Sequence, residues 1–411
     1  MSTPLLSTGT DYSTGTDYAA LAAHFRPVFA RIAEGARERE HHRTLPVAPI
    51  QWLKEAGFGT VRIPQAKGGF GASLPQLFSL LIELAEADSN LPQALRAHVA
   101  FVEDQLNQPD SPARDRWFRR FIDGEIVGSG WTEIGNVKLG EVNTKVTPQD
   151  RGWRLDGEKF YSTGTLFADW IDVFAERSDT GGAVIALVST HQPAVERLDD
   201  WDGFGQRLTG SGTTRFKAAQ VEQEHVYDFA ARFRYQTAFY QHVLLATLAG
   251  IARAVLRDVK AEVQQRRRVY SHGNAGQVRE DAQVLQVVGQ IASWAFATEA
   301  TVLQATHSLQ QAYEAHLSED EALKQALNIT AEIDAAKAQA IASDLVPRAA
   351  TELFNALGAS DTRLSKALDR HWRNARTVAS HNPVIYKLRN VGDWEVNGKE
   401  PVFVWQIGNG G

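Results

Sequence analysis

Long helical segments and short strand-like segments occupy separate stretches of this 411-residue chain, and this separation restricts the folds open to it. Apolar residues recur at helical spacing as far as Leu106, short strand-like runs follow Ile126, and helical spacing returns after Val226. A Rossmann or barrel fold needs strands and helices that alternate along the chain. The sequence therefore predicts an α+β fold in which a β domain separates two helical domains.

The last part of the chain predicts a four-helix bundle. Four segments with short connections carry apolar residues at helical spacing, namely 229–268, 277–315, 320–357 and 366–380. The predicted organisation is a disordered tail at 1–18, an N-terminal helical domain at 19–124, a middle β domain at 125–227, a C-terminal helical bundle at 228–392 and a C-terminal extension at 393–411.

The middle β domain is predicted from short runs rich in β-branched and aromatic residues. The runs cover 141–146, 153–155, 159–162, 170–175, 183–188 and 213–216. Between the second and third runs, the residues Asp-Gly-Glu at 156–158 have the composition of a tight turn. We expect this turn to join two strands of a hairpin.

Charge and hydropathy argue against several classes of protein. The formal net charge of −6 disfavours broad nucleic-acid binding. The first residues lack the basic and apolar regions of a signal peptide, and the apolar stretch at 242–256 is too short to span a bilayer. We expect a cytoplasmic protein without a nucleic-acid or membrane partner.

The chain contains no cysteine, and Met1 is its only methionine. Without cysteine there is no disulfide, thiolate nucleophile or thiolate-ligated metal, and no metal site is predicted. Avoidance of sulfur suits a protein that a cell makes when sulfur is scarce, which points to sulfur scavenging. Compositional drift is the alternative, because other apolar residues can replace methionine and cysteine in most cores.

Two Gly-rich segments of the β domain carry candidate ligand contacts. The segment GWTEIGN supplies Trp131, Thr132 and Asn136, whose ring, hydroxyl and amide suit a flat heteroaromatic ligand. The segment YSTGT supplies Thr163, whose hydroxyl beside a glycine can bind a ring or a phosphate. A buried strand with a tryptophan and a hydrogen-bonded strand end are the structural alternatives.

The helical part carries two further polar clusters. Three arginines at 266–268 close a long helix, where they either clamp a phosphate or face water at the helix C-terminus. The segment 369–383 (DRHWRNARTVASHNP) places Arg373 and Arg376 on one helix face. The proline that closes this segment predicts that the helix ends near His381.

These segments together resemble the acyl-CoA dehydrogenase fold. The resemblance rests on the three-part order, on WTE at 131–133, on DGEKFYSTG at 156–164 and on Gly-Ala-Ser at 358–360. The segment 369–387, followed by VGDWEVNG, resembles one branch of that family, the two-component monooxygenases that use reduced flavin. Dibenzothiophene monooxygenase and the bacterial methanesulfinate monooxygenases of sulfur assimilation belong to this branch.

One departure from the dehydrogenases bears on the reaction. Many of them place a catalytic glutamate in a turn after the helix at which this chain has His381, Asn382 and Pro383. Removal of an α-proton from an acyl thioester needs a base at this place. We therefore do not expect straightforward dehydrogenation, although a glutamate carried on another helix remains open.

The resemblance also implies roles for individual residues. The implied flavin contacts are Trp131, Thr132, Asn136, Thr163 and Arg268, the last reaching the flavin phosphate of a neighbouring subunit. His98 and His381 match two histidines that face flavin and substrate in the sulfur-oxidising relatives, and they are the candidate catalytic residues. Arg373 and Arg376 are the candidate contacts to an anionic substrate.

The reaction implied by the resemblance is monooxygenation of a small organosulfur compound through a flavin C4a-hydroperoxide, with methanesulfinate to methanesulfonate as the first expectation. A separate NAD(P)H-dependent flavin reductase would supply FMN as FMNH2, O2 would be the co-substrate, and a homotetramer is expected. An acyl-CoA dehydrogenase with FAD, a flavin N-oxygenase of an amine or amino sugar, and a non-catalytic helical scaffold remain alternatives.

Overall fold

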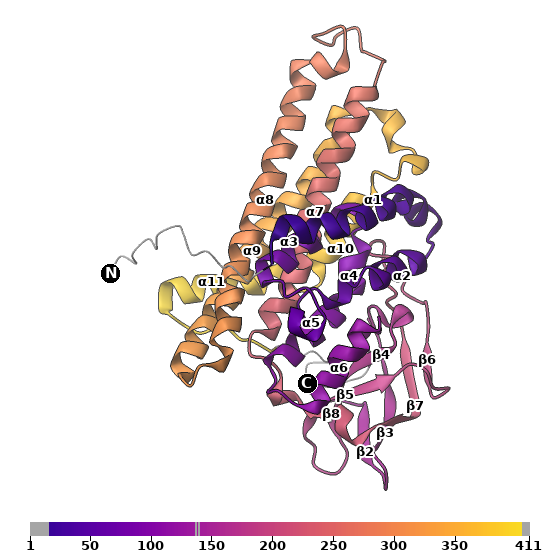
Figure 1. Cartoon of the computed structure of the whole chain (residues 1–411). Helices are drawn as coiled ribbons and strands as arrows, with labels where there is room; N and C mark the ends of the chain where they lie inside the picture. The colour runs from indigo at the N-terminus through magenta and orange to yellow at the C-terminus, as the bar shows by residue number, and fades with distance from the viewer. Residues whose placement is uncertain (1–15, 136–137, 139, 405–411) are drawn as a thin grey trace.

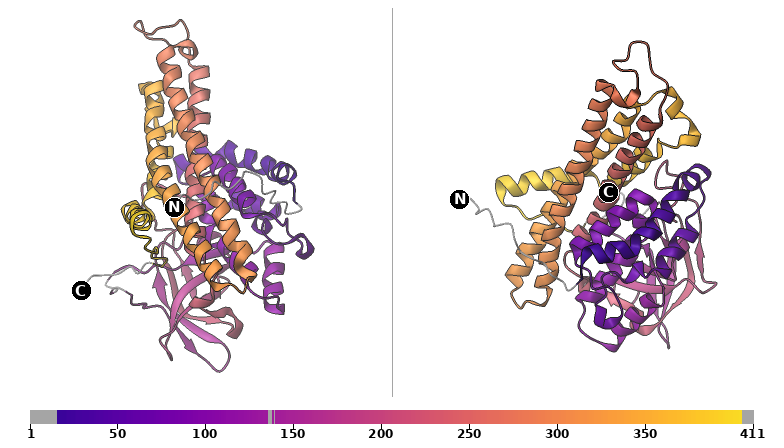
Figure 2. Two further views of the ribbon diagram at one scale, coloured as in Figure 1. Left: turned by 90° about the vertical axis from the view of Figure 1, so that its left-hand side faces the viewer. Right: turned by 45° about the horizontal axis from the view of Figure 1, so that its top comes forward.

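The computed structural model describes residues 16–135, 138 and 140–404, which form three parts (Figure 1). An N-terminal set of helices lies against both a β-sheet and a long helical bundle. Two further views show the sheet and the far end of the bundle at opposite ends of the molecule (Figure 2). The predicted α–β–α order is confirmed, and the predicted tail lies outside the described residues up to residue 15.

The N-terminal helices are α1 (Tyr18–His42), α2 (Val47–Glu55), α3 (Leu74–Ala87), α4 (Asn90–Ala94), α5 (Arg96–Asn107) and α6 (Pro112–Ile122). Three of them, α1, α3 and α6, begin at a residue whose side chain caps them. At the start of α1 the Asp17 carboxylate accepts hydrogen bonds from two backbone N–H groups, and at the start of α3 Ser73 and Gln76 form a capping box. These caps hold α3 in the position from which it joins the bundle.

The middle part is an eight-stranded sheet. Its strands are β1 (Val127–Gly130), β2 (Lys145–Pro148), β3 (Trp153–Lys159), β4 (Trp170–Arg177), β5 (Ala183–Ser189), β6 (Val195–Arg197), β7 (Thr214–Val221) and β8 (Val226–Asp228). The order is β6-β7-β3-β2-β4-β5-β8, with β1 beside β4. Both β1 and β2 run parallel to β4, and the other pairs are antiparallel.

The predicted hairpin turn at 156–158 is wrong. Strand β3 continues through these residues, and its register against β7 shifts between Leu155 and Gly157. Gly157 has a φ of +150°, and a Cβ there would lie 2.7 Å from the Cα of Thr144. The Asp-Gly pair is therefore an irregularity of the β-bulge type, at a place where only glycine leaves room for the neighbouring strand.

The helical bundle follows the sheet. Its helices are α7 (Gln236–Gln265), α8 (Ala282–Glu314), α9 (Glu321–Ala356) and α10 (Arg370–Ser380), as predicted, and α11 (Val384–Asn397) then passes the boundary predicted between 392 and 393. Among the described helices, α7 alone is long and apolar enough to cross a membrane, but 83% of its most apolar window is buried inside the protein. It packs against α3, α8 and α9, so it is the core helix of the bundle.

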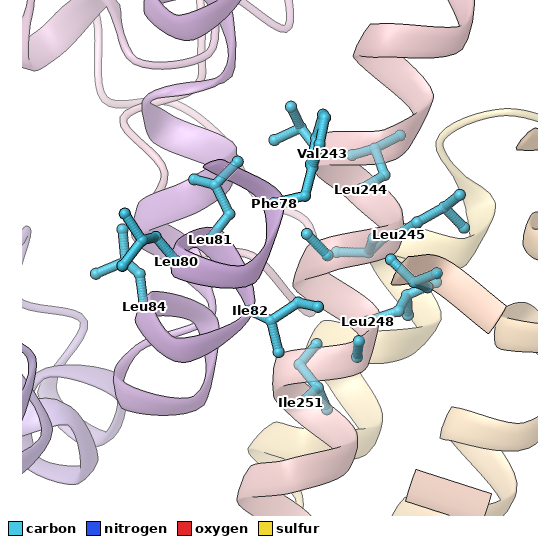
Figure 3. Close-up of a cluster of buried hydrophobic side chains, with 14 of the residues drawn as sticks. Phe78, Leu80, Leu81, Ile82, Leu84, Val243, Leu244, Leu245, Leu248 and Ile251 are labelled. Atoms are coloured by element: carbon cyan, nitrogen blue, oxygen red, sulfur yellow. The ribbon is translucent and has the colours of Figure 1, made fainter. Parts of the chain in front are cut away.

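Close packing of α3 on α7 connects the N-terminal helices to the bundle (Figure 3). Phe78 and Ile82 of α3 pack against Leu248 and its neighbours on α7, and all are fully buried. The two backbones approach each other at Gly250, where a Cβ would lie 2.3 Å from the Cβ of Ala85. A small residue at this crossing is therefore a requirement of the fold.

We expect Gly250→Ala to lower the free energy of unfolding by about 1–3 kcal/mol, because the added methyl group overpacks the α3–α7 contact. Gly289→Ala on α8 is the matched control, since a Cβ there meets nothing within 4 Å. Alanine at that exposed helix position should raise the free energy of unfolding by up to about 1 kcal/mol. Urea unfolding followed by circular dichroism measures both values, and equal effects at the two positions would contradict the close approach.

Candidate active site

A buried ion pair connects the sheet to the first turn of the bundle. Asp172 of β4 and Arg232, just before α7, have an Oδ2–Nη1 distance of 2.9 Å, and both side chains are almost fully buried. Burial alone lowers the pKa of Arg232, but the nearby Asp172 carboxylate outweighs this effect and the pKa is raised. The charge of Arg232 is therefore held beside this carboxylate in the interior, where separating the two groups would be costly.

The ion pair positions two aromatic side chains. The other Asp172 oxygen accepts a hydrogen bond of 2.9 Å from Nε1 of Trp131, at the end of β1. Arg232 donates to the hydroxyl of Tyr240 on α7 at 3.2 Å. The Trp131 and Tyr240 rings lie 5.6 Å apart in an edge-to-face arrangement. Trp131 is thus fixed at the junction between sheet and bundle, with its ring half-buried.

The loop that carries Thr163 lies beside β1 and α4. The Thr163 carbonyl accepts a hydrogen bond of 2.9 Å from the backbone N–H of Ser129 in β1. Gly164 has a φ of +80°, and a Cβ there would lie 2.1 Å from the carbonyl oxygen of Ala94. The buried hydroxyl of Ser162 has no hydrogen-bond partner among the described residues. This loop therefore brings hydroxyl groups close to the beginning of α5.

Arg96, the first residue of α5, is a buried cation without a counter-ion. Its side chain is only 9% exposed, and no described residue accepts a hydrogen bond from it or forms an ion pair with it. Its guanidinium lies 5.5 Å from the centre of the Tyr240 ring. Burial lowers the pKa of Arg96 to about 10, so the group stays charged at neutral pH. Tyr240 thus lies between Arg96 and Trp131.

His381 lies at the end of α10, as predicted. Burial, and then the charge of Arg96, lower its pKa to about 3, although its side chain remains open to solvent. The His381 ring therefore combines a lowered pKa with a side chain that solvent can reach. The next residue, Asn382, donates to the side chain of Gln241 on α7 at 2.7 Å, and its carbonyl accepts from Gln339 on α9 at 2.8 Å. The end of α10 is thereby held against two other helices.

Trp131 and His381 belong to one group of neighbouring side chains, because the Trp131 ring meets Tyr240, the Arg96 guanidinium lies over Tyr240, and the charge of Arg96 acts on His381. Thr163 lies in the adjacent loop, whose Gly164 approaches Ala94. The backbone of Thr132 pairs with Phe160 at the edge of this region. Asn136, the remaining predicted contact of the Gly-rich segment, lies outside the described residues. Two predicted site residues from distant parts of the sequence therefore lie in one region, and Thr163 lies beside it.

His98 is not brought to this region. Its Nε2 lies 3.0 Å from the carbonyl oxygen of Gly59, and its ring meets the edge of Phe121 on α6. The ring is fully buried, and burial lowers its pKa to about 4. Residues two apart on a helix do not share a face, so His98 points elsewhere than Arg96. No contact recorded for His98 reaches His381.

The other predicted residues are Arg373, Arg376 and Arg268. Arg373 donates to Glu40 at 2.9 Å and to Asp369 at 2.8 Å, so its guanidinium ties α10 to α1, whereas Arg376 is exposed. Arg268 is also exposed and follows the far end of α7. The stretch of α7 from Tyr240 to its last residue, Gln265, spans about 38 Å at 1.5 Å per residue. Arg268 therefore lies far from Tyr240 of the same chain.

Sequence reasoning missed Arg96, Tyr240 and the Asp172–Arg232 pair. The one available signal was the arginine inside the apolar run LPQALRAHVAF. Arginine is rarely buried without a partner, so its place in this run made it a candidate functional residue. Asp172 and Arg232 are far apart in sequence, and nothing in either local pattern predicts that they meet.

We expect acid to destabilise the protein in part through His98. The folded pKa is about 4, below the ordinary value of 6.5, so the unfolded chain takes up a proton that the folded protein does not. Between these two values the free energy of unfolding should fall by about 1.4 kcal/mol per pH unit as the pH is lowered.

His98→Gln should reduce this slope, because glutamine does not titrate. The exposed His41→Gln change is the control and should leave the slope as it is. Urea unfolding at a series of pH values between 7 and 4.5 measures the slopes. An unchanged slope for His98→Gln would show that this histidine is protonated inside the fold.

Comparisons with known proteins agree with this architecture. The acyl-CoA dehydrogenase N-terminal domain matches residues 17–125, and the acyl-CoA dehydrogenase C-terminal domain matches residues 242–385. A probable FMNH2-dependent monooxygenase, SfnC of Pseudomonas putida, is 27% identical over 92% of this chain and 94% of its own length.

Two solved structures extend the likeness to the whole fold. The FMN-bound form of TdsC from Paenibacillus sp. A11-2, a dibenzothiophene monooxygenase, is 26% identical with a TM-score of 0.84, covering 94% of this chain and 99% of its own. Methanesulfinate monooxygenase MsuC from Pseudomonas fluorescens is 24% identical with a TM-score of 0.83, covering 93% and 98%. This chain belongs to the acyl-CoA dehydrogenase family, and its similarity to flavin-dependent monooxygenases of that family spans about nine-tenths of its length.

Proposed function

We propose that this chain is the oxygenase component of a two-component, FMNH2-dependent monooxygenase that acts on a small organosulfur compound. The similarity to SfnC, TdsC and MsuC supports this class, because it covers the N-terminal helices, the sheet and the bundle alike. A flavin-dependent oxidoreductase of this type needs a separate flavin reductase as a transient partner, since the chain carries no nucleotide-binding fingerprint of its own.

One observation favours oxygenation over dehydrogenation. The side chains that border the site from the helical side are His381 and Arg96, and no described carboxylate interacts with either. The buried carboxylate beside Trp131, that of Asp172, is committed to Arg232 and Trp131. Abstraction of an α-proton needs a free base. A site bordered by an unpaired cation and a neutral histidine does not supply one, so acyl-CoA dehydrogenation is the weaker candidate.

The site suits a bound FMN ring. Trp131 offers an aromatic face, and the loop at 161–165 offers the Thr163 hydroxyl, which lies 2.8 Å from the hydroxyl of Ser211, for the polar edge of a ring. Reduced FMN, when bound, supplies the two electrons needed for the reduction of O2. The chain's own residues exclude water through Tyr240 and the apolar bundle, and they place hydrogen-bond donors at the reacting atoms.

We further propose that the site is completed by a second copy of the chain. Arg268 lies too far from Tyr240 to reach the same site, but it can bind the flavin phosphate of a neighbour. Exposed apolar side chains on α8 and α11, such as Phe296 (76% exposed) and Ile385 (65%), offer surface for such an assembly. A homotetramer remains the expected state.

His381 is the proposed hydrogen-bond donor to the reacting oxygen. Its low pKa keeps the imidazole neutral at working pH, so one ring nitrogen carries a proton and the other does not. A neutral N–H group beside the site can donate a hydrogen bond to the reacting oxygen. Asn382 and its contacts to α7 and α9 hold the histidine in place.

Methanesulfinate is the proposed substrate and methanesulfonate the product. One atom of O2 forms the new S–O bond, the other leaves as water, and FMNH2 provides two electrons and two protons for that water. The absence of cysteine and of any methionine beyond Met1 supports a role under sulfur limitation. It also leaves few side chains in the protein for a peroxide to oxidise.

The test is turnover with FMNH2 from an added flavin reductase, NADH, air and methanesulfinate. We expect methanesulfonate to form in a near one-to-one ratio with flavin oxidised, as measured by NMR and oxygen uptake. Dibenzothiophene, an aliphatic amine and an acyl-CoA are the parallel substrates. Reduction of an electron-acceptor dye by the acyl-CoA, without oxygen, would overturn the monooxygenase assignment.

We expect His381→Gln to fold normally and to lower methanesulfonate yield at least tenfold, while flavin oxidation continues and hydrogen peroxide accumulates. The reason is that an exposed residue at a helix end has little effect on packing, whereas its N–H group acts on the reacting oxygen. His41→Gln serves as the control for loss of a histidine elsewhere. An undiminished yield of methanesulfonate in His381→Gln would remove this residue from the mechanism.

A further inference from the structure

Arg96 stands out among the buried cations of the described chain because nothing neutralises it. The other deeply buried arginines have carboxylate partners, such as Asp172 for Arg232 and Glu103 for Arg62. Arg96 is 9% exposed and has neither an ion pair nor a hydrogen-bond acceptor among the described residues. A buried charge without a partner is costly in the free protein, and a ligand of opposite charge would remove this cost.

The residues around Arg96 contact its side chain but accept no hydrogen bond from its guanidinium. The Tyr240 ring, 5.5 Å away, attracts the guanidinium through a cation–π contact but leaves its N–H groups free. One helical turn earlier, the buried side-chain oxygen of Gln93 also lacks a partner. Gly164 allows the Thr163 loop to approach Ala94, two residues before Arg96. The N–H donors of Arg96 are therefore free among the described residues.

We propose that Arg96 binds the substrate, and that it selects organosulfur compounds carrying a negatively charged oxyanion over neutral sulfides and sulfones, an assignment that rests on the proposed function. A guanidinium offers two parallel N–H groups that match the two oxygens of a sulfinate. Arg373 and Arg376 do not compete for this role, because the first is tied to Glu40 and Asp369 and the second is exposed outside the site.

The experiment compares binding of methanesulfonate with binding of dimethyl sulfone, which has nearly the same shape but no charge. Isothermal titration is done on the full-length protein with oxidised FMN present, for wild type, Arg96→Met, Arg96→Lys and Arg119→Met. Arg119 is an exposed arginine of α6 and controls for loss of one positive charge. We expect Arg96→Met to lose affinity for methanesulfonate at least about tenfold, with no change for dimethyl sulfone.

Arg96→Lys should lose less, because it keeps the charge but not the paired donors. It also supplies the comparison if Arg96→Met does not fold. The ligand-free Arg96→Met protein should be more stable in thermal unfolding than wild type, since an unpaired buried charge has been removed. A purely structural arginine would give the opposite result and would overturn the proposal.

The outcomes separate this inference from the proposed function. If wild type binds methanesulfonate through Arg96 but does not oxidise methanesulfinate, the oxygenase assignment falls and the anion site stands. If wild type oxidises methanesulfinate and Arg96→Met does so with an unchanged KM, the inference falls and the oxygenase assignment stands. Loss of FMN affinity in Arg96→Met with intact methanesulfonate binding would show that Arg96 is a flavin contact, and would equally overturn the proposal.

Discussion

The buried pair between Asp172 and Arg232 is the contact on which the candidate site depends. It joins a central strand of the sheet to the segment that leads into α7, and it does so in an interior where neither charge can be left alone. Its remaining donors and acceptors fix Trp131 on one side and Tyr240 on the other. The sheet and the bundle can therefore come together in only one register.

The sheet, the N-terminal helices and the bundle each contribute side chains to the candidate site. The sheet contributes Trp131 and the Thr163 loop, the N-terminal helices contribute Arg96, and the bundle contributes Tyr240 and His381. Figure 3 shows α3 packed on α7 through Ile82 and Leu248, and the two helices come closest at Gly250. A site at the meeting of three layers suits chemistry that must exclude water.

The candidate site contains one pair of charges that neutralise each other and one charge without a counter-ion. Asp172 and Arg232 cancel each other beside Trp131, so a neutral aromatic ring can lie there without an ionic contact. Arg96 has no such partner, and a neutral histidine is its neighbour. Proteins keep an uncompensated buried charge where function uses it, at a cost in stability that the rest of the core must offset.

The sequence by itself determined the α–β–α order, the bundle and the helix end at His381, because periodicity, caps and proline act locally. It misjudged the Asp-Gly pair at 156–158, since bulge and hairpin turn use the same residues and only the partner strand distinguishes them. It also predicted a catalytic role for His98, which the fold places against Gly59, away from His381. Only tertiary structure decided that Arg96 lacks a counter-ion and that Asp172 meets Arg232, because both facts depend on contacts between distant segments.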